Sequence, residues 1–366
     1  MSDRPKPLRG RGAVTNPASR YLAHDRDAVD DGWWQESDPL APPPAPTEIG
    51  VDHSRRVISY NKSPDLPFDR TANPYRGCEH GCIYCYARPT HAWLGLSPGL
   101  DFERRLFHKP DAAAQLRREL AAPSYRPATL VLGANTDPYQ PVERGLGRTR
   151  ELLEVLAESR HPVAITTKSA LVLRDLDLLT EMATRRLVAV HLSVTTLDAD
   201  LARRLEPRAS SPCRRLEAVR ALAAAGVPTG VLVSPLIPGL TDGDLERILA
   251  LATDAGASRA GAQLIRLPLE IKGLFTDWLG AHFPERADKV LSLIRQCRSG
   301  RLNDPDFGTR MTGTGPVAEL LQQRLRLALK RYGLTRQDSG WALDATRFRR
   351  PAIHGSAGAR QLSLFE

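Results

Sequence analysis

The sequence predicts an α/β protein whose core is an open (β/α)6 partial TIM barrel with N- and C-terminal extensions. From about residue 70, short runs of β-branched and aliphatic residues alternate with amphipathic helical segments, the pattern of repeated strand–helix units. Six such units can be counted, fewer than the eight strands of a closed barrel. The chain has 366 residues, 42% of them hydrophobic, which is enough for one such domain with tails.

The predicted strands are short and rich in Val, Leu, Ile and Thr. In chain order they are 73–77, 129–132, 163–166, 187–194, 230–233 and 263–265. Amphipathic helices are expected between them, near 147–159, 171–186, 212–226 and 243–256. The third helix is sharply delimited, because Ser211 suits the N-cap, Pro212 the first helical position and Gly226 the C-terminal end.

The two ends of the chain differ in composition from the predicted core at 65–300. Residues 1–60 are rich in Pro, Arg, Asp and Gly and show no sustained periodicity, so we expect an extended, largely disordered arm. Trp33 and Trp34 would dock this arm on the barrel or on a partner. Residues 301–366 form a basic extension with eleven Arg or Lys against six Asp or Glu, in a chain of net charge +9. Such an excess suits a phosphate backbone, or simply a solvated surface.

Composition also bears on where the protein works. No run of 18 or more apolar residues is present, and the first residues lack the apolar stretch of a signal peptide. We therefore expect a cytoplasmic protein without a membrane partner. Two of the five cysteines, Cys213 and Cys297, are solitary, which suits a reducing compartment where thiols serve metals rather than disulfides.

The other three cysteines form the strongest motif of the chain. Cys78, Cys82 and Cys85 have the spacing C-x3-C-x2-C, and three thiolates can hold three corners of a cubane iron–sulfur cluster and leave the fourth iron open. A tetrahedral zinc site with His80 or His91 as the fourth ligand is the alternative. Zinc motifs usually pair their cysteines as C-x2-C, and no second pair exists here.

This spacing, with Tyr84 before the last thiol, resembles the signature of the radical S-adenosylmethionine (SAM) enzymes. The resemblance implies a [4Fe-4S] cluster whose open iron is chelated by SAM, an electron donor such as flavodoxin or ferredoxin, and reductive cleavage of SAM to a 5′-deoxyadenosyl radical. It also implies a (β/α)6 partial barrel with the cluster in the loop after the first strand.

The end of the second predicted strand identifies a narrower resemblance. The Gly-Gly-Glu motif common in the superfamily is absent, and Asn135-Thr136-Asp137-Pro138 resembles the spore photoproduct lyase-like branch, loosely called DNA repair photolyases. Side-chain oxygens of Asn135, Thr136 and Asp137 would then receive the SAM amino group. The same tetrapeptide is also a good turn between a strand and a helix.

Residues on the next strands complete the expected cofactor site. Lys168 would pair with the SAM carboxylate, and Ser193 matches a serine that the related lyases use, with Thr195 on the same face. Glu206 and Arg208 resemble a family block that contacts ribose or carboxylate, although a salt bridge at a helix end is an equal alternative.

Two tyrosines flank the last cysteine of the cluster. In the photoproduct lyase branch, tyrosines at the positions of Tyr84 and Tyr86 are thought to return a hydrogen atom toward SAM, whereas packing under the loop is the commoner role of such residues. The cysteine that donates hydrogen in the lyase has no counterpart, because none lies between Cys85 and Cys213. Repair of spore photoproduct itself is therefore not expected.

The C-terminus carries a motif of its own. Gln361, Leu362, Ser363, Leu364 and Phe365 resemble the pentapeptide by which bacterial polymerases and repair proteins bind the sliding clamp; a tail folded back on the barrel is the alternative. Basic residues precede it on an expected helix at 317–332 and around Phe348, where they suit phosphates and bases: Arg324, Arg326, Lys330, Arg331, Arg347, Arg349 and Arg350.

Three functional hypotheses follow from these motifs. The first is a radical SAM enzyme, lyase-like, that acts on DNA or another nucleic acid. The second keeps the radical chemistry and modifies a protein or an RNA. The third is a zinc-stabilised nucleic-acid-binding module without catalysis.

Overall fold

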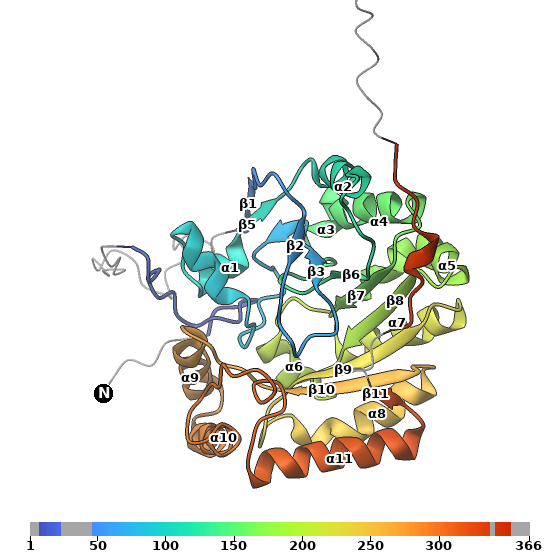
Figure 1. Ribbon diagram of the computed structural model, residues 1–366. Helices are drawn as coiled ribbons and strands as arrows, with labels where there is room; N and C mark the ends of the chain where they lie inside the picture. The colour runs from blue at the N-terminus through green and yellow to red at the C-terminus, as the bar shows by residue number, and fades with distance from the viewer. Residues whose placement is uncertain (1–6, 23–45, 337–340, 353–366) are drawn as a thin grey trace, which may run out of the picture.

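The protein folds around one large, strongly curved parallel sheet, seen in the computed structural model, which describes residues 7–22, 46–336 and 341–352 (Figure 1). Trp33, Trp34 and the tail 361–366 lie outside these residues. The sheet has the strand order β11-β10-β9-β8-β7-β6-β3-β2, and only β2 runs antiparallel to its neighbour. Its strands are β2 (Ile58–Tyr60), β3 (Arg70–Ala72), β6 (Leu130–Leu132), β7 (Val163–Thr167), β8 (Val188–Ser193), β9 (Thr229–Leu236), β10 (Arg259–Leu264) and β11 (Thr335–Arg336).

Helices cover the convex side of this sheet, as parallel strands connected by crossovers require. They are α2 (Ala112–Ala121), α4 (Arg148–Glu158), α5 (Leu176–Thr184), α7 (Pro212–Ala224), α8 (Leu245–Asp254) and α11 (Pro316–Tyr332). Their apolar stripes and the strands form the main hydrophobic core. The barrel strands β3, β6, β7, β8, β9 and β10, with the short parallel strand β11 added at one edge, do not close on themselves, which confirms the predicted partial barrel.

A second, smaller sheet supports the loop that carries the cysteines. It has the order β1-β5-β4, with β1 (Glu48–Val51), β5 (Arg105–His108) and β4 (Tyr75–Arg76). The short helices α1 (Leu100–Arg104), α3 (Glu143–Leu146) and α6 (Ala199–Leu205) lie among the loops. Two longer helices follow β10, namely α9 (Ile271–His282) and α10 (Pro284–Gln296), and they form a second core cluster with residues of the cysteine loop.

Two predicted strands are misplaced at their ends. The first barrel strand is 70–72 and not 73–77, because Pro74 has no N–H for a ladder and Tyr75 and Arg76 pair instead with β5 in the smaller sheet. The last barrel strand begins at Arg259, four residues before the predicted start, in a stretch that lacks β-branched residues. Its small residues Gly261 and Ala262 line the cavity in the barrel.

The remaining predicted elements agree closely with the structure. The third helix spans Pro212–Ala224, with the Ser211 hydroxyl 3.5 Å from the Arg214 amide as its N-cap, and Gly226 has a left-handed φ of 77°. The expected helix 171–186 divides into a 3-10 segment, Ala170–Asp175, and α5. No described helix combines the length and hydrophobicity needed to cross a bilayer.

Parts of the expected N-terminal arm belong to the fold. Ala13 is completely buried, and the amides of Gly12 and Ala13 donate to the Glu103 carboxylate at 2.9 and 2.8 Å. A Cβ on Gly12 would lie 1.8 Å from the Gly81 carbonyl oxygen, so only glycine allows this approach. An extended, disordered arm therefore does not describe residues 11–19 or the strands β1 and β2; the boundaries of the three predicted domains stay a prediction.

Candidate active site at the carboxyl ends of the strands

The cysteine loop is fastened to two separate parts of the fold. Its backbone amides donate from Cys78 to the Phe102 carbonyl at 3.0 Å and from Ile83 to the Leu205 carbonyl at 3.1 Å. Cys78 and Cys82 are buried, Cys85 is half-buried, and none of the three forms a disulfide. The loop is therefore a rigid carrier of three thiols.

Arg88 holds this loop in place through hydrogen bonds to its backbone, a role that sequence analysis did not predict. Its guanidinium is fully buried and donates to the carbonyl oxygens of Cys82 at 2.8 Å and Gly81 at 3.0 Å. It also pairs with the buried Glu103 at 2.5 Å. A buried ion pair of this kind survives only when its other hydrogen-bonding groups are satisfied, and here the loop carbonyls satisfy them.

The donor set suits a thiophilic metal centre. Burial raises the pKa of all three thiols, and the negative charges of Asp137 and Glu206 raise the pKa of Cys78 and of Cys82 further. Bound metal would supply the positive charge that thiolates in such a place need. Within the described residues, no group of three or more His, Cys, Asp or Glu is already arranged to hold a metal ion. The chemistry of the residues fits an iron–sulfur cluster on this loop.

The two histidines of the zinc alternative are engaged elsewhere. His80 Nδ1 lies 3.3 Å from Asp137 Oδ2. His91 Nε2 lies 2.8 Å from the Arg105 carbonyl oxygen, and burial lowers the pKa of this imidazole to about 4.

The turn after β6 connects the cysteine loop to β7. Thr136 donates from its hydroxyl to the Gly77 carbonyl at 2.6 Å. Asp137 accepts from the Thr167 hydroxyl at 2.6 Å and from the Lys168 amide at 2.8 Å. Asn135 is half-buried beside them, with its amide 3.3 Å from Asn73 Oδ1. These bonds agree with the turn alternative for Thr136 and Asp137; a contact with SAM stays a prediction.

Glu206 is the centre of a buried network that includes several predicted residues. It accepts from the Tyr84 hydroxyl, from the Thr195 hydroxyl at 2.7 Å and from the guanidinium of Arg215. Burial alone would raise its pKa, but the charges of Arg215 and Lys168 and the hydrogen bonds outweigh burial and lower it to about 2. Glu206 is therefore an anion whose oxygens are already engaged by protein groups.

Lys168 lies at the edge of this network. Its ammonium donates to the Ser234 carbonyl at 3.0 Å, is 3.6 Å from Glu206 Oε1 and lies 5.7 Å from the ring centre of Tyr84. Fractional exposure of the side chain is 15%, so the cation remains accessible at the mouth of the barrel. Arg215, which sequence analysis missed, also holds the Ser193 carbonyl at 2.9 Å and so ties the end of β8 to the network.

Arg208 and Tyr86 lie apart from Glu206. The Arg208 guanidinium is 3.0 Å from Glu79 Oε1, where it braces the cysteine loop. Tyr86 is 48% exposed and donates from its hydroxyl to the Ala134 carbonyl. The structure thus brings together Tyr84, Lys168, Thr195 and Glu206, and places Arg208 and Tyr86 on other sides of the loop.

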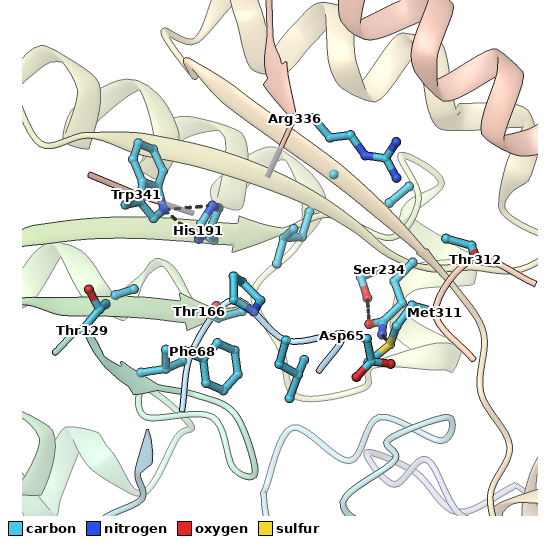
Figure 2. A pocket seen from close by; sticks show the side chains of 18 of the residues that line it. Asp65, Phe68, Thr129, Thr166, His191, Ser234, Met311, Thr312, Arg336 and Trp341 are labelled. Carbon is cyan, nitrogen blue, oxygen red and sulfur yellow. Dashed lines mark hydrogen bonds between the residues drawn. The ribbon is translucent and has the colours of Figure 1, made fainter. Parts of the chain in front are cut away.

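A cavity of about 390 Å³ fills the interior of the barrel below these residues (Figure 2). At one end the Trp341 indole N–H donates to a ring nitrogen of His191 at 3.2 Å. At the other end, toward the carboxyl ends of the strands, lie Ser234, Met311 and Asp65. Asp65 pairs with Arg310 through two bonds of 2.6 Å, and this pair joins the loop before β3 to the loop before α11 across the open side of the barrel.

Some of the basic and aromatic residues predicted to bind nucleic acid make contacts within the protein instead. Arg324 on α11 pairs with Glu246 at 2.7 Å. Phe348 packs against Tyr125 and His161, with ring centres 5.8 and 5.5 Å apart. The Leu face of α11 is buried in the main core, which agrees with the alternative that this helix covers the barrel.

Comparison with known proteins identifies the family. The sequence matches the family model of the radical SAM superfamily over residues 72–252. It is 39% identical over 279 residues to the uncharacterized protein Rv2578c of Mycobacterium tuberculosis, over 75% of this chain and 78% of that protein. The chain belongs to the radical SAM superfamily. MJ0683 of Methanocaldococcus jannaschii is a more distant relative, 28% identical over 195 residues, which are 53% of this chain and 70% of that protein.

The radical SAM fold is shared with a solved lyase. Spore photoproduct lyase complexed with dinucleoside spore photoproduct has a TM-score of 0.56 and 17% sequence identity, over 79% of this chain and 81% of that chain. At this identity the likeness is one of fold. The segment matched by the radical SAM family includes the three cysteines, Lys168 and Glu206, whereas Arg266 and the cavity wall at 308–312 lie beyond it.

Proposed function

We propose that the protein is an enzyme that holds a [4Fe-4S] cluster on Cys78, Cys82 and Cys85 and binds SAM at the open iron. When bound and reduced, this pair would supply a 5′-deoxyadenosyl radical. The observation that carries the proposal is the cysteine loop itself: three thiols free of disulfides, at the carboxyl ends of the strands, in a member of the radical SAM superfamily.

The residues around the loop would bind and orient the cofactor. Lys168, whose partly exposed ammonium lies 3.6 Å from Glu206 Oε1, would pair with the SAM carboxylate. Asn135 would receive the amino group, with Thr136 and Asp137 holding the turn in place. Ser193 and Thr195 line the same side, and Glu206 would act mainly through the groups it holds, namely Tyr84 and Lys168.

The two tyrosines divide the predicted hydrogen relay between them. Tyr84 is buried, and its hydroxyl donates to the Glu206 carboxylate. Tyr86 is half-exposed and faces the mouth of the barrel. We propose that both take part in catalysis, with Tyr86 nearer the substrate.

The proposed substrate is DNA or another nucleic acid. Three features support it: the net charge of +9, the cavity of about 390 Å³ that is lined by Met311, and the shared fold with a lyase solved in complex with dinucleoside spore photoproduct. Modification of a protein or RNA uses the same radical and remains the second candidate. A zinc module without catalysis loses support, because the chain belongs to a superfamily of enzymes.

Two protein partners complete the proposal. A flavodoxin or ferredoxin would deliver the electron. The tail 361–366 would bind a sliding clamp, and binding of purified clamp by the full chain should be lost when these six residues are deleted. Unchanged clamp binding by the truncated chain would refute that role.

The experiment for the enzyme proposal is anaerobic reconstitution with iron and sulfide, followed by SAM and a reductant. We expect a brown protein with about four irons per chain. A candidate oligonucleotide or peptide deuterated at its reactive carbon should pass deuterium to the 5′-deoxyadenosine formed. A colourless protein that retains zinc would contradict the proposal. Deuterium transfer from a peptide, and not from nucleic acid, would contradict the substrate.

A further inference from the structure

Arg266 stands at the mouth of the barrel, two residues beyond the end of β10. Its guanidinium carbon lies 5.9 Å from the ring centre of Tyr86, and its Nη1 lies 3.9 Å from the Met311 sulfur, which lines the cavity. Within the described part of the chain, Arg266 forms no ion pair, and its buried Nε has no hydrogen-bond acceptor. A buried donor without an acceptor is destabilising, so its presence at a cavity mouth needs an explanation.

The surroundings of Arg266 increase its need for an anion. The nearby carboxylate, Asp65, has both oxygens engaged by Arg310 at 2.6 Å. The positive charge of Arg310 repels Arg266 and, together with burial, lowers the pKa of its guanidinium, which nevertheless stays charged. Two arginines thus lie near a single carboxylate that pairs with only one of them, and the mouth of the barrel carries an excess of positive charge.

We propose that Arg266 binds a phosphate group of a nucleic-acid substrate at the entrance of the cavity. This inference rests on the proposed function. A guanidinium presents paired N–H donors that match the oxygens of a phosphate. A phosphate seated there would lie beside the half-exposed ring of Tyr86, and the nucleotide that carries it would enter the cavity past Met311.

The position of Arg266 favours a substrate phosphate over the SAM carboxylate. The two cations of the site lie against different tyrosines: Lys168 is near the buried Tyr84, on the side of Glu206, whereas Arg266 is near the exposed Tyr86. A basic chain and an Arg beside an exposed aromatic favour nucleic acid over an acidic peptide.

The test measures the binding of a short fluorescein-labelled single-stranded oligodeoxynucleotide to the full-length, cluster-loaded protein over a range of salt concentrations. Each phosphate contact on a single strand contributes about −0.7 to the slope of log K against log salt. We expect Arg266→Gln to weaken binding about 10-fold and to lower the steepness of this slope by about 0.7, since one contact is lost. Arg266→Lys should keep the slope, and SAM affinity should be the same in all variants.

Arg220→Gln is the matched control. Arg220 is an exposed arginine on α7, and α7 contributes no residue to the cavity. It should leave the slope and the affinity as in the wild type. An unchanged slope in Arg266→Gln, or a loss of SAM affinity in that variant, overturns the inference alone. Wild-type protein that cleaves SAM but binds neither this oligonucleotide nor its double-stranded form overturns the nucleic-acid target and this site together. An acidic peptide of the same length is measured in parallel. If Arg266→Gln weakens binding of this peptide and not of the oligonucleotide, the inference is overturned in favour of a peptide carboxylate.

Discussion

Glu206 shows how a single buried residue holds several side chains of the candidate site in place. It is 2% exposed and neutralises Arg215, whose guanidinium is also buried. Through the same carboxylate it fixes the hydroxyls of Tyr84 and Thr195. Of the two interpretations of this residue from sequence, the salt bridge at a helix end agrees with these contacts.

Replacement of Glu206 should therefore be costly for stability. Glu206→Gln keeps the shape but leaves Arg215 as an uncompensated buried charge, and we expect a loss of about 3–5 kcal/mol in the free energy of unfolding. The control is Glu217→Gln, which breaks an exposed pair with Arg214 at 3.0 Å and should change stability by less than about 1 kcal/mol. Urea unfolding of the three proteins measures both values; equal stability of the two variants would contradict the account.

Gly133 is a second residue near the candidate site, and its backbone conformation and close packing require glycine. It follows β6 with φ of 95°, and a Cβ there would lie 2.0 Å from the Thr166 carbonyl oxygen. Gly133→Ala should lower stability by about 2–4 kcal/mol, because the strained backbone and the clash add, and it should weaken SAM binding by displacing Asn135. Gly145→Ala on α3 meets no atom within 4 Å and should leave both properties intact. A thermal melt and equilibrium dialysis with SAM would show whether the two glycines differ as expected.

At the scale of elements, the small sheet β1-β5-β4 connects the N-terminal segment to the cysteine loop through Asp52. This carboxylate follows β1, pairs with Arg76 on β4 at 2.8 Å and lies 3.5 Å from the ammonium of Lys109, just after β5. Burial would raise its pKa, but hydrogen bonds from Ser54 and Arg76 and the charge of Lys109 prevail and lower it to about 2.

This pKa shift predicts a pH dependence with a definite sign. Because the folded pKa of Asp52 is below its ordinary value of 3.8, its contribution to stability is complete above that pH and is lost as pH falls through about 2. Wild type should exceed Asp52→Asn by about 2 kcal/mol near neutral pH, and the difference should narrow below about pH 4. Urea titrations at several pH values measure it; a difference that stays constant with pH would show that Asp52 does not act through its charge.

At the scale of the whole molecule, two loops far apart in sequence close the open side of the barrel. The residues before β3 and those before α11 meet in the Asp65–Arg310 ion pair, which is largely buried, with exposed fractions of 11% and 14%. The cavity is lined from both loops, by Phe68 on one and Met311 on the other (Figure 2). The pair therefore joins the two loops that line this side of the cavity.

Breaking this pair should loosen both loops together. Asp65→Asn removes the charge and one acceptor, and we expect faster amide hydrogen exchange in peptides covering 61–69 and 304–312, with no change in the strands. The exposed pair Arg214–Glu217 supplies a control, since Glu217→Gln should leave these peptides as they are. Faster exchange in one loop without the other would contradict a joint closure.

Much of this molecule could be predicted from its sequence, and the misses have physical causes. The runs at 163–166 and 187–194 are mostly apolar, as is typical of buried parallel strands, and β7 and β8 lie there. The strand β10 escaped prediction over most of its length because its small residues serve the cavity. Local motifs such as the cysteines could be recognised, whereas Arg215 and Arg266 could not, since folding alone brings their neighbours to them.

The most direct test of the account is the 5′-deoxyadenosine formed when the reconstituted protein is incubated anaerobically with SAM and a reductant. We predict that the wild type forms it, that Cys213→Ala forms as much, because Cys213 is exposed at the start of α7, and that Cys82→Ala forms none above background. Equal yields from wild type and Cys82→Ala, or no 5′-deoxyadenosine from wild-type protein that carries its iron, would contradict the claim that the three thiols of the loop hold the reactive centre.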